Sequence, residues 1–146
     1  MRIGLTNDHR GFITKTYLKD FLIASGYIVK DYGAESEESV DFPDYAQLLG
    51  KAIQQRQVDL GIAICGTGIG MSIALNKMKN IYCAKASNVS EAILSKSHND
   101  ANVLAISEDL SEELVKEIVI KFIETPFSNI DRYIKRNNKI KDIENA

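Results

Sequence analysis

The chain has 146 residues, of which 45% are hydrophobic and 26% charged, and its formal net charge is −2. This length and composition predict a single domain over residues 1–146 with an apolar core, and the lack of a basic arm or a long apolar run argues against nucleic-acid and membrane partners. Because the N-terminus has no signal-peptide pattern and there are only two cysteines, Cys65 and Cys83, we expect a cytoplasmic protein with free thiols.

Strand-like apolar runs alternate with helical periodicity along the chain. Strands are predicted at residues 2–6, 27–30, 59–64, 81–86 and 102–106. Helices are predicted at residues 12–25, 45–55, 71–78, 90–96 and 111–124, with Ser90 and Ser111 as N-caps. These β/α units predict a Rossmann-like three-layer α/β/α sandwich with a five-stranded parallel sheet. A last, charged helix at about 128–143 lies outside this alternation, and we expect it to pack on a partner subunit or to reach over a site.

Ligands of such sheets bind beyond the carboxyl ends of the strands, at a switch in strand order. Three polar clusters are candidates for this place: residues 7–10 after the first strand, the glycine loop after the third, and Ser97-His98-Asn99-Asp100 before the fifth. The third cluster lies at a helix end. It contributes only if that end faces the site or a neighbouring subunit.

The glycine loop, Cys65-Gly66-Thr67-Gly68-Ile69-Gly70, is the most informative segment. Glycines at every second position let backbone N–H groups point at a ligand, and the following helix adds the positive end of its dipole. This arrangement predicts an anion held beside a thiol, which suits the formation of an enolate. The spacing is not G-x-G-x-x-G and no acid ends the next strand, so an NAD cofactor is disfavoured. A tight strand–helix turn is the structural alternative.

Each candidate side chain also has an ordinary structural interpretation. Cys65 can be a small core residue, but its place beside N–H groups and a helix N-terminus favours a thiolate. The two histidines, His9 and His98, lie in polar clusters without metal-ligand spacing, so no metal site is expected. Arg132 and Arg136 share one helix face, which is equally compatible with a solvated surface and with a phosphate-binding pair.

In combination, four motifs resemble the ribose-5-phosphate isomerase B family, which also contains galactose-6-phosphate and allose-6-phosphate isomerases. They are Asp8-His9-Arg10-Gly11-Phe12, Ser39-Val40-Asp41-Phe42-Pro43-Asp44-Tyr45-Ala46, Cys65-Gly66-Thr67-Gly68-Ile69-Gly70-Met71-Ser72 and His98-Asn99-Asp100-Ala101-Asn102. The resemblance covers nearly the whole chain. Cys65 and the pair at 98–99 are more similar to the ribose-5-phosphate branch than to the galactose-6-phosphate branch.

The resemblance implies an aldose–ketose isomerase of carbohydrate metabolism that needs no metal or other cofactor and converts ribose 5-phosphate to ribulose 5-phosphate. It also implies a homodimer or homotetramer with active sites shared between subunits. Cys65 would move a proton between C2 and C1, Thr67 would pass a hydroxyl proton, and His98 and Asp8 would open the furanose ring. The substrate would be held by the backbone of Gly66, Gly68, Ile69 and Gly70, by Tyr45 and Asn99, and at its phosphate by His9, Arg132 and Arg136.

One turn departs from the family pattern. Where the family has an arginine that assists phosphate binding, after the fifth strand, this chain has Ser107-Glu108-Asp109. An acid there repels a phosphate. Either the remaining cations hold the phosphate alone, or the substrate is another aldose phosphate such as allose 6-phosphate or galactose 6-phosphate. A non-catalytic sugar-phosphate-binding protein and a redox-sensing thiol protein are alternatives from other classes.

Overall fold

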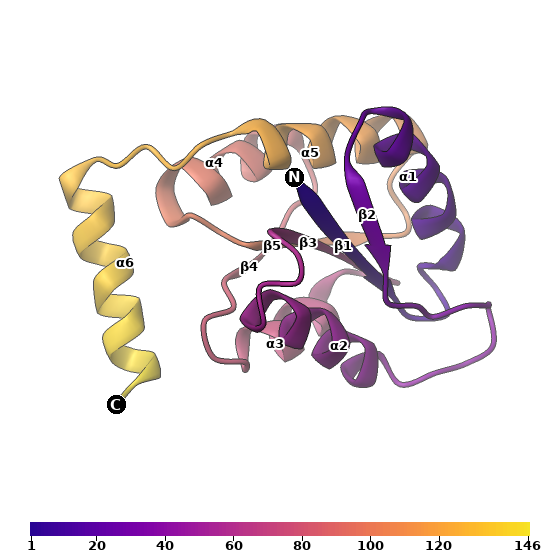
Figure 1. The fold of residues 1–146 in the computed structure, drawn as a ribbon, viewed down its shortest axis with the longest axis horizontal. Coiled ribbons are helices and arrows are strands. Elements are labelled where there is room, and N and C mark those ends of the chain that lie inside the picture. The colour runs from indigo at the N-terminus through magenta and orange to yellow at the C-terminus, as the bar shows by residue number, and fades with distance from the viewer.

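The structure, a computed structural model, describes all residues from Met1 to Ala146 (Figure 1). The strands are β1 (Arg2–Asn7), β2 (Ile28–Asp31), β3 (Leu60–Cys65), β4 (Cys83–Lys85) and β5 (Val103–Ser107). The helices are α1 (Phe12–Ala24), α2 (Phe42–Gln54), α3 (Ile69–Asn76), α4 (Val89–Asn99), α5 (Glu112–Glu124) and α6 (Asp131–Glu144). No helix combines the length and the apolar character that crossing a membrane requires.

All five strands are parallel and lie in the order β2-β1-β3-β5-β4. From β1 the chain goes to one side of the sheet, and from β3 it goes to the other, so the strand order switches between these two neighbours. Asn7 and Ile64 are partners in register at the carboxyl end of this pair. The predicted Rossmann-like sandwich is confirmed, and its switch point lies where such sheets bind ligands.

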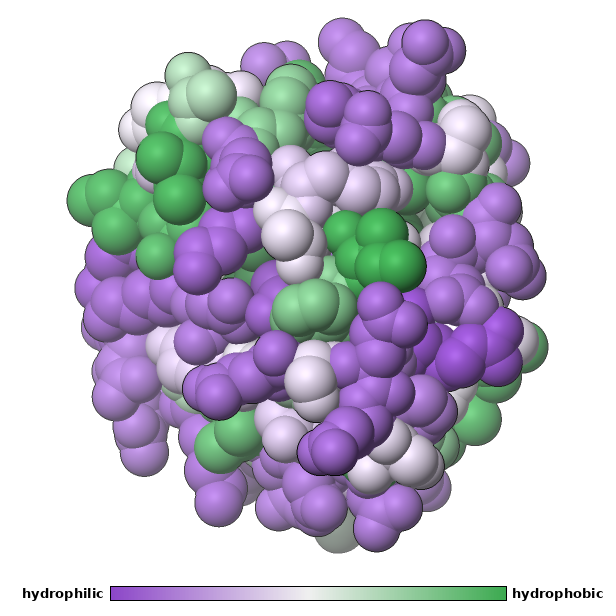
Figure 2. Space-filling model, turned by 90° about the vertical axis from the view of Figure 1, so that its right-hand side faces the viewer, coloured by the Kyte–Doolittle hydropathy of each residue, from purple (hydrophilic) through white to green (hydrophobic).

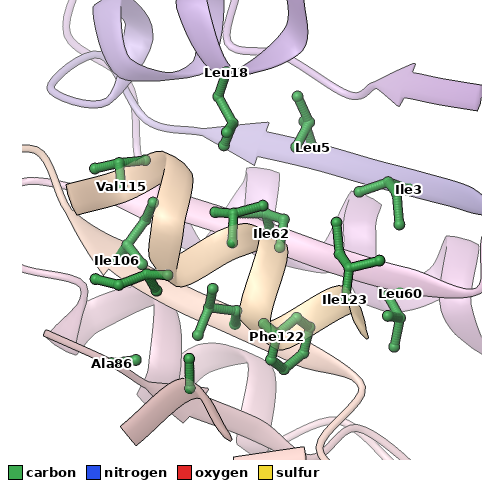
Figure 3. Close-up of a cluster of buried hydrophobic side chains, with 14 of the residues drawn as sticks. Ile3, Leu5, Leu18, Leu60, Ile62, Ala86, Ile106, Val115, Phe122 and Ile123 are labelled. Atoms are coloured by element: carbon green, nitrogen blue, oxygen red, sulfur yellow. The ribbon is translucent and has the colours of Figure 1, made fainter. Parts of the chain in front are cut away.

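The sheet is covered on both faces. Helices α1, α4 and α5 contribute to the cluster of buried apolar side chains on one face, and α2 and α3 to the cluster on the other. Figure 3 shows Leu18 of α1, Phe122 of α5 and Ile62 of β3 in the same cluster of buried side chains. All three are fully buried, and each such side chain contributes about 2 kcal/mol to stability.

Helix α4 begins differently from the prediction. Its N-cap is Asn88 rather than Ser90, because the Asn88 Oδ1 accepts the Glu91 N–H at 2.8 Å. The Glu91 carboxylate in turn accepts the N–H of Ser87, the residue before the cap, at 3.0 Å, so the cap and the first turn hold each other in place. The predicted cap at Ser111 is confirmed, since its Oγ accepts the Leu114 N–H at 3.2 Å.

Other element bounds also shift. Helix α2 starts at Phe42, three residues before the predicted start, because Pro43 is compatible with the first turn of a helix. Edge strand β4 has only three residues, fewer than the predicted range 81–86. Helix α6 starts at Asp131 rather than at 128 and ends within one residue of the prediction.

Helix α6 lies apart from the two helical layers. Figure 1 shows it beside the sandwich, joined by an extended segment, and its main helix partner is α4. None of its residues is buried, and Ile143 is 77% exposed. At its far end, the Glu144 carboxylate accepts the Asn80 N–H at 2.8 Å. The helix thus leaves Ile134, Ile140 and Ile143 exposed within one chain, Ile143 most of all.

Candidate functional site

The candidate site lies where β1 and β3 end. The N–H of Asp8 donates to the carbonyl of Ile64 at 3.1 Å, so the polar segment after β1 lies directly beside the end of β3. Gly11 permits this approach, because a Cβ there would be 2.6 Å from the Ile64 oxygen. Figure 2 faces this side of the molecule and shows neutral and apolar residues in the middle of a hydrophilic surface.

Cys65 is the last residue of β3 and is only 4% exposed. Its sulfur accepts the backbone N–H of Gly68 at 3.1 Å. Gly68 has a φ of +78°, and a Cβ on it would be 3.1 Å from the backbone carbon of Ile106. A glycine is therefore needed for the turn that directs this N–H at the sulfur. The loop thus directs one backbone hydrogen-bond donor at the sulfur atom.

The rest of the glycine loop forms an open face beside the thiol. The hydroxyl of Thr67 accepts the N–H of Ile69 at 3.1 Å, and both residues are exposed. That hydroxyl keeps its own hydrogen for another acceptor. A Cβ on Gly70 would be 2.8 Å from the ring of Phe42, so the start of α3 packs closely on α2.

Asp8 and His9 are held by backbone donors. The Oδ1 of buried Asp8 accepts the N–H groups of Arg10 at 2.9 Å and Gly11 at 3.1 Å, which fixes the turn into α1. The Nδ1 of His9 accepts the N–H of Val40 at 3.2 Å. Its neutral ring therefore carries the proton on Nε2, which is left as a donor for a ligand.

Tyr45 lies on α2 behind the loop that connects β2 to this helix. Its ring packs against Gly33, where a Cβ would be 3.0 Å from the Tyr45 Cε1. Its backbone carbonyl accepts the Thr6 hydroxyl at 3.0 Å. The ring borders a cavity of about 260 Å³ that is otherwise lined by the connecting loop, including Val40, the residue bound to His9.

The other predicted residues form a separate cluster on α4 and α6. The ring of His98 stacks on Tyr133, with centroids 4.2 Å apart and planes within 16°. The guanidinium of Arg132 lies 4.8 Å from the centre of the same Tyr133 ring, and that of Arg136 lies 5.9 Å from it. The side-chain amide of Asn137 donates to the carbonyl of His98 at 3.0 Å.

This second cluster lies at the amino ends of the strands, whereas Cys65 lies at their carboxyl ends. Asn99 and Asn137, joined at 3.1 Å, line a cavity of about 480 Å³ together with Leu60, the first residue of β3. Helix α4 runs antiparallel to the strands, so its end lies at their amino edge. From Leu60 to Cys65 the strand spans about 16 Å. Within one chain, therefore, His98 and Asn99 do not reach the thiol.

Sequence reasoning did not find the contacts of four residues near these clusters. Tyr133 and Asn137 hold the end of α4 to α6, and aromatic and amide residues on a charged helix give no local signal of such contacts. Arg10 and Glu108 form an ion pair across the carboxyl edge, although they are 98 residues apart in sequence. No group of three or more His, Cys, Asp or Glu side chains is arranged to hold a metal ion.

The fold and the thiol beside a glycine cradle define a Rossmann-like α/β protein with a candidate anion site at its switch point. The family model described as Ribose/Galactose Isomerase matches residues 3–140, and the chain belongs to this family. The chain is 44% identical over 119 residues to ribose-5-phosphate isomerase B of Escherichia coli, covering 81% of this chain and 80% of that protein.

Solved structures agree in fold. The Clostridium thermocellum ribose-5-phosphate isomerase B structure is 40% identical, with a TM-score of 0.97 over 99% of this chain and 98% of that one. The Mycoplasma genitalium ribose-5-phosphate isomerase B structure, with bound ribulose-5-phosphate, is 31% identical. Its TM-score is 0.93 over 99% of this chain and 96% of that one.

Proposed function

We propose that this chain is a sugar-phosphate isomerase that interconverts ribose 5-phosphate and ribulose 5-phosphate through an enediolate, with Cys65 as the base. The observation that carries the proposal is the N–H of Gly68 directed at the Cys65 sulfur beside the glycine cradle. Relatives support the choice of substrate: the Escherichia coli protein is a ribose-5-phosphate isomerase B, and the Mycoplasma genitalium structure holds ribulose-5-phosphate.

In the proposed reaction, the thiolate of Cys65 takes the proton from C2 of the open-chain aldose, and the electron pair forms the C1–C2 double bond while the carbonyl oxygen O1 becomes the oxyanion. The loop N–H groups bind this oxyanion, and each good donor contributes roughly 3–4 kcal/mol in a preorganised site. The hydroxyl of Thr67 passes a proton from O2 to O1. Cys65 then returns its proton to C1, which gives the ketose.

The residues at the other edge of the sheet enter this reaction from a second copy of the chain. We propose a homodimer in which His98 and Asn99 of one copy approach the Cys65 of the other. His98 and Asp8 would open the furanose ring, and Arg132 and Arg136 would join His9 at the phosphate. The separation of the two clusters within one chain and the exposed isoleucines of α6 support this arrangement.

The first experiment is turnover of ribose 5-phosphate by the purified protein, with allose 6-phosphate and galactose 6-phosphate alongside. Cys65→Ala should lower kcat by at least about 1,000-fold and leave the affinity for the sugar phosphate nearly unchanged. Cys83→Ala is the matched control and should keep its activity. A correctly folded protein that turns over none of the three sugars would contradict the proposal, and so would undiminished turnover in Cys65→Ala.

The sharing of sites has its own test, by mixing two inactive variants. When Cys65→Ala and His98→Ala are unfolded and refolded together, about half of the dimers contain one chain of each. Each mixed dimer then has one intact site of two, so the mixture should recover roughly a quarter of the wild-type activity. If the refolded wild type is active and the mixture stays inactive, each site is built from one chain.

A further inference from the structure

The turn after β5, which carries acids in place of the expected arginine, holds a different arginine from the start of the chain. The Nε of Arg10 donates to Glu108 Oε1 at 2.8 Å, and its Nη2 donates to the same oxygen. Asp109 is also close enough to raise the pKa of Arg10, although less than the hydrogen bond and charge of Glu108 do. The guanidinium of Arg10 thus lies beside the turn after β5, where the family resemblance leads us to expect an arginine.

The same guanidinium lies over the glycine loop. A Cβ on Gly66 would be 3.4 Å from Arg10 Cζ and 3.5 Å from Nη1. Nη1 donates no hydrogen bond within the chain, and the Arg10 side chain is 57% exposed. The hydroxyl of Ser107 donates to the Gly66 carbonyl at 2.7 Å and accepts the Asp109 N–H at 3.1 Å, so the turn and the loop are fixed relative to each other.

We propose that Arg10 binds the phosphate of the substrate in place of the arginine expected at position 109, with Glu108 holding its guanidinium over the glycine loop. Arg10 follows His9 directly, and its unused Nη1 provides the donors that a phosphate oxygen accepts. Glu108 binds the other side of the guanidinium, at Nε and Nη2. Its negative charge at the same time repels the phosphate. This inference rests on the proposed function, because it names a further residue of the same site.

The test compares KM with kcat. Arg10→Ala should raise the KM for ribose 5-phosphate and the inhibition constant of inorganic phosphate by about 10- to 100-fold, while kcat changes by less than about threefold. Arg10→Lys should recover part of the loss. The control is Arg2→Ala, since Arg2 is held by Asp59 through Nε and Nη2 at the other edge of the sheet. Unchanged constants in Arg10→Ala would overturn the proposal.

A double variant separates phosphate binding from a simple ion pair. Glu108→Gln keeps the acceptor and removes the charge, so it should lower KM by about threefold. If Arg10→Ala acts only by leaving Glu108 to repel the ligand, combining it with Glu108→Gln restores the wild-type KM, and the proposal is wrong. We expect the double variant to keep a KM at least about fivefold above that of Glu108→Gln.

Calorimetric titration with ribose 5-phosphate keeps this inference distinct from the proposed function. A wild type that binds the sugar phosphate without converting it contradicts the isomerase, while the Arg10→Ala dissociation constant still decides the role of Arg10. A wild type that binds neither ribose 5-phosphate nor inorganic phosphate overturns both.

Discussion

The N–H of Gly68 points at the sulfur of Cys65 from 3.1 Å, and the backbone turn that aims it is open only to glycine. One residue therefore sets both the shape of the loop and the electrostatic surroundings of the thiol. A side chain at position 68 strains the positive φ and also meets the backbone of Ile106. The stability and the activity of the protein should for this reason depend on the same glycine.

Gly68→Ala should lower both the free energy of unfolding and kcat. The left-handed backbone costs an alanine about 1 kcal/mol, and the displaced loop should lower kcat by at least about tenfold. Gly26→Ala is the matched control, because Gly26 has a φ of +94° with no atom within 4 Å of its Cβ position. Gly26→Ala should lower the free energy of unfolding through backbone strain and leave kcat unchanged. Urea unfolding and turnover measure both effects, and a Gly68→Ala enzyme with wild-type kcat would contradict this prediction.

The alternation of strands and helices was predictable because apolar periodicity and glycine positions are local signals. The order of β5 and β4 was not, since both strands are short apolar runs that can pair with β3. The edge at which His98 lies follows from the direction of α4, and its sequence motif alone does not indicate which chain it serves. The pairing of Arg10 with Glu108 spans 98 residues and leaves no trace in local sequence.

The start of α4 shows how a local signal can be ambiguous. Asn88 and Ser90 are both good N-cap residues, but only Asn88 bonds to an N–H three residues on, that of Glu91. Asn88→Ala should lower the free energy of unfolding by about 1 kcal/mol, and Ser90→Ala by less than about 0.5 kcal/mol. The urea midpoints of the two variants distinguish the caps. A larger destabilisation by Ser90→Ala than by Asn88→Ala would identify Ser90 as the cap.

Cys83 should be unreactive in the folded protein. Burial raises the pKa of its thiol to about 12, although a hydrogen bond with Ser72 acts in the opposite direction. At pH 8 only about one molecule in ten thousand then carries a Cys83 thiolate, which is the species that iodoacetamide alkylates. In Cys65→Ala, mass spectrometry should detect no label until urea unfolds the chain. Equal labelling rates with and without urea would contradict the raised pKa of Cys83.

Lys15 and Asp31 form the most buried ion pair, with Lys15 Nζ 2.9 Å from Asp31 Oδ2. Burial alone would raise the pKa of Asp31, but the Gly33 N–H and the Lys15 ammonium outweigh it and hold this pKa below its ordinary value. Because the folded pKa is the lower one, the pair stabilises the fold fully above the unfolded pKa of about 3.9. This stabilisation is lost as the pH falls through the folded pKa.

Asp31→Asn should therefore lower the free energy of unfolding by about 3 kcal/mol at pH 7, because it leaves the Lys15 ammonium buried without its counter-charge. The difference from wild type should shrink as the pH falls below the unfolded pKa of about 3.9, and it should vanish below the lower folded pKa, where the native wild-type carboxylate is also protonated. Asp59→Asn, at the exposed pair with Arg2, is the control and should cost less than about 1 kcal/mol. Urea unfolding between pH 7 and pH 3 measures both variants. If the difference in unfolding free energy between wild type and Asp31→Asn stays constant over this range, the effect of Asp31 comes from its shape rather than from its charge.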